Sequence, residues 1–194
     1  MILSNQSLFE ALDSGRLVIR PEPGPRLSDE THRSPFQTTA VDLRLGDTIS
    51  RFAPGLAFNI DLRRGSFSSM FAANSTSVTL TQEQPYALEP GKFVLGRTLE
   101  WIELPIQADR PCLAARVEGR SSYARCGLLV HFTAPTIHAG FRGFVTLELI
   151  NLGPVPILLY PSAPICQLIV ESVAGQPFRN DSQFQGQKVP GGNA

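Results

Sequence analysis

Short apolar runs separated by turn residues fill the chain from Val41 onward, and this pattern restricts the fold more than any other feature. The separators contain Gly, Pro or Asn, as in Glu89-Pro90-Gly91-Lys92 and Asn151-Leu152-Gly153-Pro154. The runs predicted to be strands are 41–45, 93–95, 99–104, 113–117, 128–133, 144–150, 156–159 and 165–170. With 16 Gly and 16 Pro, they predict a mainly β protein, a sandwich or jelly roll. A Rossmann sheet would need a helix between successive strands and is therefore disfavoured.

One short helix is predicted near the N-terminus, over residues 4–14. Ser4 can cap it, Leu3 and Leu8 stand at the positions of a hydrophobic staple, and Gly15 can end it. No other segment has helix signals of comparable quality.

The composition is that of one globular domain spanning residues 1–194. Apolar residues make up 42% and charged residues 18%, which fits a folded chain with a substantial core. Residues 21–35 are rich in Pro, Ser and charge and are expected to form an irregular surface loop. The tail, 174–194, is polar and rich in Gly, Gln and Asn, so we expect it to be flexible or to fold onto something else.

The charge balance excludes several classes of partner. With 17 basic and 17 acidic residues the formal net charge is zero, so no basic field favours nucleic acid or an anionic membrane, and any anion site must be local. No run approaches the roughly 20 apolar residues needed to cross a bilayer, and residues 1–12 do not resemble a secretory signal. Three widely spaced cysteines, Cys112, Cys126 and Cys166, predict neither a disulfide framework nor a metal pair. We expect a cytoplasmic protein in which all three thiols are buried.

A dense cluster of cations and hydroxyls follows the run at 113–117. Arg116, Arg120 and Arg125 lie within ten residues, with Ser121 and Ser122 among them. Guanidiniums, hydroxyls and backbone N–H groups are the recurring means of gripping phosphate oxygens. The alternative is a strand-to-turn corner with ordinary surface charge.

Glu148 stands in a strand of otherwise mostly apolar residues. In an extended strand it shares a face with Thr146 and Ile150, and the opposite face is apolar. The carboxylate could simply face solvent, or it could be a general base tuned by burial and by nearby cations. The pattern alone leaves both interpretations open.

The three histidines offer no recognisable metal chemistry. His32, His131 and His138 are far apart, and no HxE with a following PCxxC, the signature of zinc deaminases, is present. The sequence also lacks a GxSxG elbow and a Walker A loop. A deaminase built on this chain would therefore work without zinc.

The ordered motifs resemble the dCTP deaminase branch of the trimeric dUTPase superfamily along nearly the whole chain. The most specific is Gly119-Arg120-Ser121-Ser122 with Ala124-Arg125. The others are Met1-Ile2-Leu3-Ser4, Gly15-Arg16-Leu17-Val18-Ile19, Ala40-Val41-Asp42-Leu43-Arg44-Leu45-Gly46, Pro90-Gly91-Lys92-Phe93-Val94-Leu95, Thr98-Leu99-Glu100, Ile102-Glu103-Leu104-Pro105, Thr146-Leu147-Glu148 with Asn151, and Ile165-Cys166-Gln167-Leu168.

The resemblance implies a distorted β-barrel of the dUTPase-like type that forms homotrimers with active sites between subunits. Glu148 would be the general base that activates a water toward C4 of cytosine, with Ser121 and Arg125 completing the catalytic group. Mg²⁺ would enter with the triphosphate, with no metal ligand from protein side chains. The tail would close over bound dCTP or dUTP, and dTTP is a possible feedback ligand. The residues implied to contact the nucleotide are Arg120, Ser121, Ser122, Tyr123, Ala124, Arg125, His138, Thr146, Leu147, Glu148, Phe178, Gln183 and Gln187.

The sequence departs from the family pattern at three places. His138 stands where the family carries an aspartate that contacts the deoxyribose, and Ala134-Pro135-Thr136 just upstream is also unusual. In the tail, Gln183-Phe184-Gln185-Gly186-Gln187 replaces Lys-Tyr-Gln-Gly-Gln, so a phosphate-facing lysine and a tyrosine hydroxyl are missing.

Three functions are compatible with these observations. The first is zinc-independent deamination of dCTP to dUTP and ammonia, which would supply dUTP and dTTP synthesis. The second is a bifunctional enzyme that continues to dUMP, which His138 opposes. The third is a non-catalytic nucleotide-binding regulatory trimer, suggested by the altered tail and opposed by the intact Ser121, Arg125 and Glu148.

Overall fold

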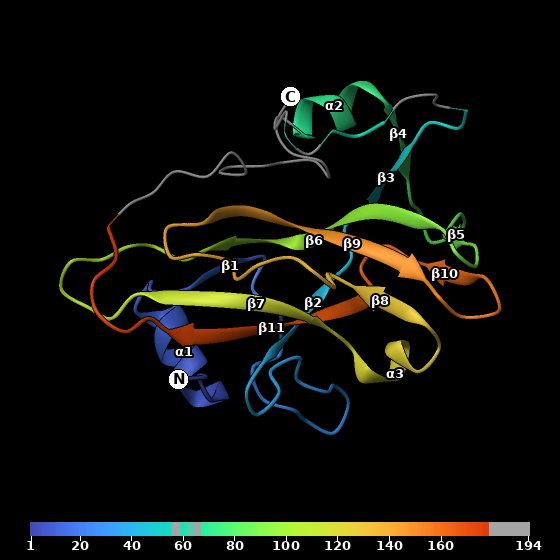
Figure 1. Cartoon of the computed structure of the whole chain (residues 1–194). Helices are drawn as coiled ribbons and strands as arrows, with labels where there is room; N and C mark the ends of the chain where they lie inside the picture. Colours follow the sequence, from blue (N-terminus) through green and yellow to red (C-terminus); the bar gives the residue numbers. More distant parts are fainter. Residues whose placement is uncertain (56–58, 62, 64–66, 179–194) are drawn as a thin grey trace.

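The computed structural model describes residues 1–55, 59–61, 63 and 67–178, and within them the chain is mainly β (Figure 1). The elements in chain order are α1 (Asn5–Asp13), β1 (Val18–Arg20), β2 (Val41–Arg44), β3 (Thr48–Phe52), α2 (Phe67–Ala73), β4 (Ser75–Thr79), β5 (Tyr86–Leu88), β6 (Phe93–Glu103), β7 (Leu113–Gly119), α3 (Ser121–Ala124), β8 (Leu128–Val130), β9 (Arg142–Asn151), β10 (Ile157–Leu159) and β11 (Pro164–Ser172).

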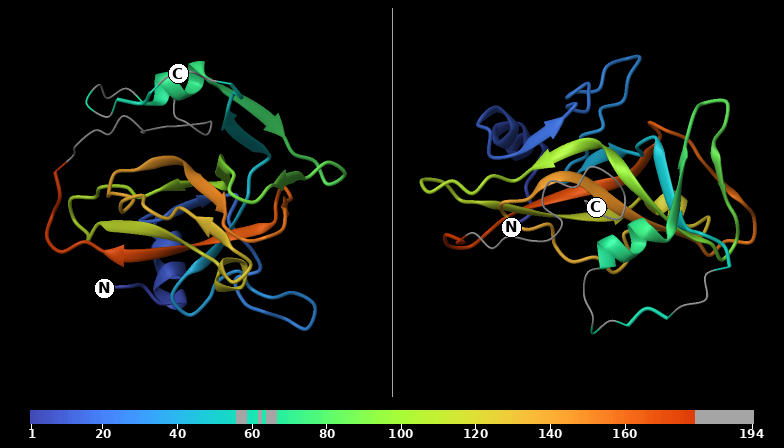
Figure 2. Two further views of the ribbon diagram at one scale, coloured as in Figure 1. Left: turned by 45° about the vertical axis from the view of Figure 1, so that its right-hand side comes forward. Right: turned by 90° about the horizontal axis from the view of Figure 1, so that it is seen from above.

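The described strands are antiparallel and form separate sheets rather than one closed barrel. The largest has the order β4-β3-β6-β9-β8 with β1 added on β6, a second has the order β2-β11-β7, and β10 pairs with β5. Figure 2 shows that α2 lies with β3 and β4, away from the layer of β2, β11 and β7. The mainly β, jelly-roll type of fold predicted from the turn spacing is confirmed.

The hydrophobic core lies between the two larger sheets. On β9, Val145, Leu147 and Leu149 are at most 2% exposed, and they share the core with Val117 of β7 and Leu168 of β11. Full burial of one such side chain stabilises the fold by about 1.5–3 kcal/mol. The alternation of buried and half-buried residues along β9 is the one expected of a strand with one face in the core.

The N-terminal helix is confirmed at α1. The Ser4 hydroxyl accepts a hydrogen bond from the Ser7 N–H at 3.2 Å, as expected of a capping serine. Leu8 is fully buried against the core, and Gly15 follows the helix with a φ of +69°. The helices of the described segments are all too short or too polar to cross a lipid bilayer.

Two short helices were not predicted. α2 has seven residues and is packed through Phe71, whose ring meets that of Phe52 edge-on at 4.8 Å. α3 has only four residues and occupies the corner that the sequence indicated as a turn. Helices this short are stabilised by tertiary contacts rather than by propensity, so their sequences carry little signal.

A single long strand, β6, replaces the two predicted runs at 93–95 and 99–104. Its register against β9 shifts between Arg97 and Trp101, which marks an irregularity in the ladder. Within this stretch the buried Thr98 hydroxyl accepts from the Val145 N–H at 3.0 Å and donates to the Glu100 carbonyl at 2.8 Å. The side chain thus replaces lost ladder bonds, and the strand continues through its polar residues.

The cysteines do not all lie in the core. Cys112 and Cys166 are buried as predicted, but Cys126 is exposed, because it follows α3 at the surface corner. Burial, followed by the nearby carboxylates of Glu100 and Asp42, raises the pKa of the Cys166 thiol. This thiol is therefore held protonated and unreactive.

We expect iodoacetamide at neutral pH to alkylate Cys126 in the native protein and to reach Cys166 only after denaturation, as read by peptide mass spectrometry. The raised pKa also means that the folded state binds the Cys166 proton more tightly than the unfolded state does. This contribution to stability is complete below the ordinary thiol pKa of 9.0 and is lost as the pH rises above it. Equal labelling rates at Cys126 and Cys166 in the folded protein would contradict this.

Candidate functional site

β9 places Glu148 on the half-buried face of the large sheet. Its side chain is 30% exposed, and the residue lies opposite Leu95 of β6. Thr146 shares this face and lies opposite Arg97, whereas the Leu147 side chain is fully buried in the core. β9 therefore presents the Glu148 carboxylate in a partly dry environment.

The partner of Glu148 is His131, a residue that the sequence analysis did not select. His131 Nδ1 lies 2.8 Å from Glu148 Oε2, and the His131 side chain is only 9% exposed. The backbone joins the same two residues, because the His131 N–H donates to the Glu148 carbonyl at 2.9 Å. The pairing of β8 with β9 brings them together, since Val130 lies opposite Leu149 and the next residue along must meet Glu148.

The conformation of His131 is itself unusual. Its φ is +56°, in the left-handed region that costs a residue other than glycine about 1–2 kcal/mol. Its ring Nε2 is buried and has no hydrogen-bond partner among the described residues. Strained backbone and an unpaired buried polar atom are features that concentrate at functional sites. The sequence signal was weak, because an isolated histidine in an apolar run is usually structural.

Most of the cluster predicted to bind phosphate lies at the corner between β7 and β8; we call Arg120, Ser121, Ser122 and Arg125 the anion cradle. Arg120 occupies the N-cap position of α3, the Ser121 and Ser122 side chains are exposed, and Arg125 occupies the C-cap position and is also exposed. Tyr123 anchors the short helix by packing against the core. Four members of the predicted cluster thus lie on or beside one short turn of helix, whereas Arg116 lies on β7 and forms ion pairs with Glu118 and Glu171.

Arg120 is held in place within this corner. Its Nη1 donates to Asp42 Oδ2 at 2.5 Å, and its guanidinium carbon lies 5.6 Å from the centre of the Tyr123 ring. Its side chain remains 29% exposed. The guanidinium is therefore oriented by two neighbours while part of it faces outward.

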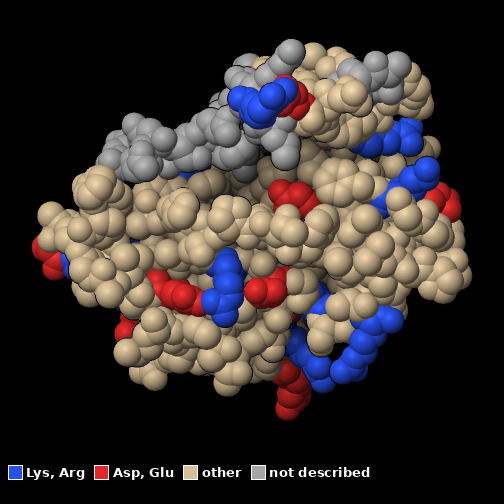
Figure 3. All heavy atoms as spheres, viewed as in Figure 1, with Lys and Arg blue, Asp and Glu red and all other residues tan. Residues whose placement is uncertain are grey.

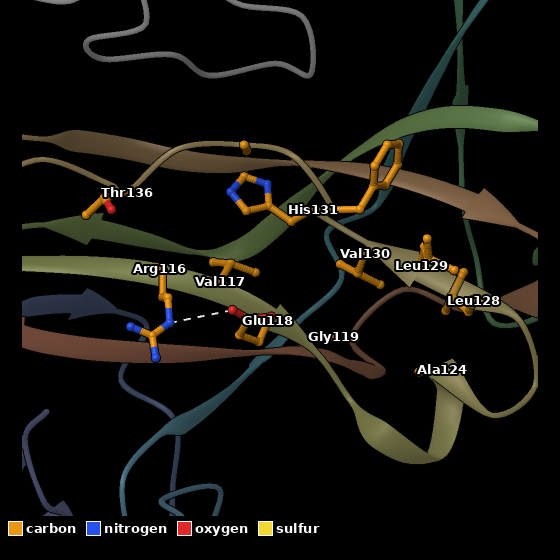
Figure 4. Close-up of a pocket in the computed structure, with 12 residues that line it drawn as sticks. Arg116, Val117, Glu118, Gly119, Ala124, Leu128, Leu129, Val130, His131 and Thr136 are labelled. Carbon is orange, nitrogen blue, oxygen red and sulfur yellow. Dashed lines mark ion pairs between the residues drawn. The ribbon is translucent and has the colours of Figure 1, made fainter.

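A cavity of about 450 Å³ lies where the edge strands β7 and β8 of the two sheets face each other (Figure 4). It reaches from Ala124 of α3 to His131, the hydrogen-bond partner of Glu148. In Figure 4, Arg116 and Glu118 of β7 lie on one side, with their ion pair drawn, and the His131 ring lies across from them. The cavity is lined by Arg116, Val117, Glu118, Gly119, Ala124, Leu128, Leu129, Val130, His131, Phe132, Ala134 and Thr136.

Of the predicted site residues, Ala124 lines this cavity, and the others either do not line it or lie outside the described residues. His138 is exposed and immediately follows Ile137, which bridges to Ala115 of β7. Phe178 is 90% exposed. Gln183 and Gln187 lie outside the described residues, so their roles stay predictions. Within the described residues, no group of three or more His, Cys, Asp or Glu side chains could hold a metal ion.

Comparison with known proteins identifies the family. The profile of the dCTP deaminase-like family matches residues 2–173. The chain belongs to the dCTP deaminase-like family. The resemblance predicted from the ordered motifs is thus confirmed.

Named relatives of the family match over almost the whole chain. The dUMP-forming dCTP deaminase of Methanosphaera stadtmanae is 35% identical, covering 97% of this chain and 91% of its own length. The dUMP-forming dCTP deaminase of Dictyoglomus thermophilum is 37% identical over 98% and 92%. The dCTP deaminase of Rhodospirillum rubrum is 36% identical over 89% and 83%.

A solved structure shares the fold. It is the 2'-deoxycytidine 5'-triphosphate deaminase from Agrobacterium tumefaciens, with a TM-score of 0.59 and 19% identity, and the match covers 87% of this chain and 47% of that one. At this identity the match shows the fold alone. The description of the candidate site is therefore based on the residues of this chain.

The charged surface of this family member fits a local anion site. On the face in Figure 3, acidic and basic side chains are scattered over a mostly uncharged surface. The zero net charge likewise provides no long-range field. Any attraction for an anion must therefore come from groups close to its binding site.

The position of α3 depends on Gly127, and this dependence can be tested. Gly127 has a φ of +93°, and a Cβ there would lie 2.2 Å from the Gly153 backbone nitrogen. We expect Gly127→Ala to lower the free energy of unfolding by at least about 2 kcal/mol in urea denaturation, because strain and a backbone clash add. The control is Gly175→Ala, where φ is +76° but the space is open, and the cost should be about 1 kcal/mol. Equal losses in the two variants would contradict this account of the corner.

Proposed function

We propose that this protein is an enzyme that hydrolytically deaminates dCTP to dUTP and ammonia. Membership of the dCTP deaminase-like family supports the substrate. The observation that carries the chemistry is the half-buried Glu148 carboxylate, hydrogen-bonded to the nearly buried His131 at the wall of a cavity that also meets α3.

In the proposed reaction Glu148 moves the protons. It accepts one proton from water as the water oxygen bonds to C4 of cytosine, and the second water proton ends on N3. Glu148 then delivers its proton to the 4-amino nitrogen, the C4–N bond breaks, and ammonia leaves a uracil ring. A carboxylate on a rigid strand suits both transfers, because it need not move between them.

His131 orients the base in this proposal. With the proton on Nδ1, the imidazole donates to Glu148 Oε2, and Glu148 Oε1 would then accept a hydrogen bond from the reacting water. The tautomer leaves Nε2 as an acceptor, and a bound water or the substrate would satisfy that buried atom. His131 is thus a positioning residue beside the catalytic carboxylate.

The triphosphate is proposed to bind at α3, through Arg120, the hydroxyls of Ser121 and Ser122, and Arg125. Guanidiniums, which can bind two oxygens at once, and hydroxyls match the phosphate oxygens. Ser121 and Arg125 would also complete the catalytic group, as the family resemblance implies. Mg²⁺ would accompany the nucleotide and neutralise phosphate charge. The exposed hydroxyls and guanidiniums of this corner are donors, so they suit the phosphates, and the metal would be held by phosphate oxygens. We further propose a homotrimer in the cytoplasm with sites between subunits, and dTTP as a feedback ligand.

A second candidate is a bifunctional enzyme that continues to dUMP. Two of the relatives described above, at 35% and 37% identity, are named dUMP-forming dCTP deaminases. His138, at the exposed position implied to contact the sugar, is the feature of this chain that opposes it.

The deciding experiment is incubation of the pure protein with dCTP and Mg²⁺, with separation of nucleotides and pyrophosphate by anion exchange. We expect dUTP and an equal amount of ammonia. Formation of dUMP with pyrophosphate would replace the first candidate by the second. Unchanged dCTP, together with tight nucleotide binding in a titration, would show a nucleotide-binding regulator instead.

The roles of base and cradle are separable by substitution. We expect Glu148→Gln to lower kcat by at least about 10³-fold, because proton transfer is lost, while the Kd for dCTP changes by less than about threefold. Arg125→Ala should weaken both binding and turnover. The control is Glu103→Gln, which alters a carboxylate of the same sheet with a similar exposure of 26% and should leave kcat unchanged. Equal loss of dCTP binding in Glu148→Gln and Arg125→Ala would show that the roles are assigned wrongly.

A further inference from the structure

Asp42 is a buried carboxylate that the proposed chemistry does not use. The residue lies on β2 and is 8% exposed. Its carboxylate accepts hydrogen bonds from Gln167 Nε2 at 2.8 Å, Gln37 Nε2 at 3.4 Å and Arg120 Nη1 at 2.5 Å. A charge removed from water is costly unless it is paired and hydrogen-bonded, so a carboxylate with donors from three segments is a built arrangement.

The register of the sheet formed by β2, β11 and β7 explains why these groups meet. Asp42 lies opposite Gln167 on β11, and Gln167 lies opposite Glu118 on β7. Residues directly opposite on neighbouring strands share a face, so the row leads from Asp42 to the end of β7, where Arg120 begins the corner. The Arg120 side chain turns back along this face to reach Asp42, rather than extending freely into solvent.

The two contacts of Arg120 have different consequences for an anion. The hydrogen bond to Asp42 holds the Nη1 end of the planar guanidinium. The central carbon of the guanidinium lies over the Tyr123 ring, 5.6 Å from the ring centre. Because the guanidinium is a rigid fork, fixing one end also fixes the direction of its other N–H groups. A preset fork loses less side-chain freedom when it binds phosphate than a mobile arginine does.

We infer that Asp42 is a positioning residue for polyphosphate binding, which acts through Arg120 and is supported by Gln167. This inference rests on the proposed function, in which Arg120 contacts the triphosphate. Asp42 does not touch the ligand: it holds the guanidinium in the orientation that phosphate requires. If Asp42 instead merely neutralised Arg120 and weakened phosphate binding, removing its charge would lower the Kd for polyphosphate rather than raise it.

The test is isothermal titration of the full-length protein with inorganic tripolyphosphate, a probe whose binding does not depend on deamination. We expect Asp42→Asn to raise the Kd about tenfold, and Arg120→Lys to raise it by a similar factor. The double variant should bind no more weakly than Arg120→Lys alone, because Asp42 acts only through that guanidinium. Additive losses, an unchanged Kd or a lower Kd in folded Asp42→Asn would each overturn the inference.

Two further variants separate positioning from stability. Gln167→Met keeps the side-chain volume, removes one donor to Asp42 and should raise the Kd about threefold, so it serves if Asp42→Asn does not fold. Asp42→Glu should recover part of the binding. The matched control is Asp13→Asn, which breaks an Asp–Arg pair of 2.8 Å between α1 and the 21–35 loop and should leave the Kd unchanged.

Kinetics then distinguish failure of the inference from failure of the proposed function. With dCTP, Asp42→Asn should raise KM about tenfold with kcat within twofold of wild type, because the base at Glu148 is untouched. A wild-type protein that binds tripolyphosphate but does not deaminate dCTP would overturn the proposed function and leave the role of Asp42 standing. A fall in kcat with unchanged KM would overturn the positioning role and leave the deaminase standing.

Discussion

The antiparallel pairing of β9 with β6 on one side and β8 on the other is the constraint on which the rest of the structure depends. The ladder forces alternate side chains to opposite faces, so burial of Val145, Leu147 and Leu149 in the core commits Glu148 to the other face. The same register brings His131 to Glu148. The same strand pairing therefore determines both the packing of the core and the position of the candidate base.

The corner at α3 is held by a different set of forces. Tyr123 packs against the core, Asp42 holds Arg120, and Gly127 lets the chain pass against the Gly153 backbone. A four-residue helix has little stability of its own, so these contacts decide where the exposed hydroxyls and guanidiniums lie. The apolar core positions the base, whereas ion pairing and close backbone approach position the anion cradle.

Much of the fold could be predicted from local pattern, and the misses share a cause. The spacing of turn residues predicted the β architecture, and the capping serine predicted α1, because both are local signals. α2 was not predicted because the contact between Phe71 and Phe52 stabilises it, and local sequence does not encode that contact. β6 was predicted as two strands because the hydrogen bond from the Val145 N–H to the Thr98 side chain, which keeps the strand continuous, leaves no signal in the local pattern. Cys126 was placed in the core because cysteine usually lies there, yet its position after α3 exposes it.

For the site, the sequence by itself determined the reactive groups: a carboxylate in an apolar strand, a run of hydroxyls and guanidiniums after another, and a family resemblance that the comparisons confirm. Only the tertiary structure decided their partners. Strand register places His131 beside Glu148, 17 positions away in the sequence, and Asp42 beside Arg120, 78 positions away. Such pairings are set by long-range packing, and no local pattern encodes them.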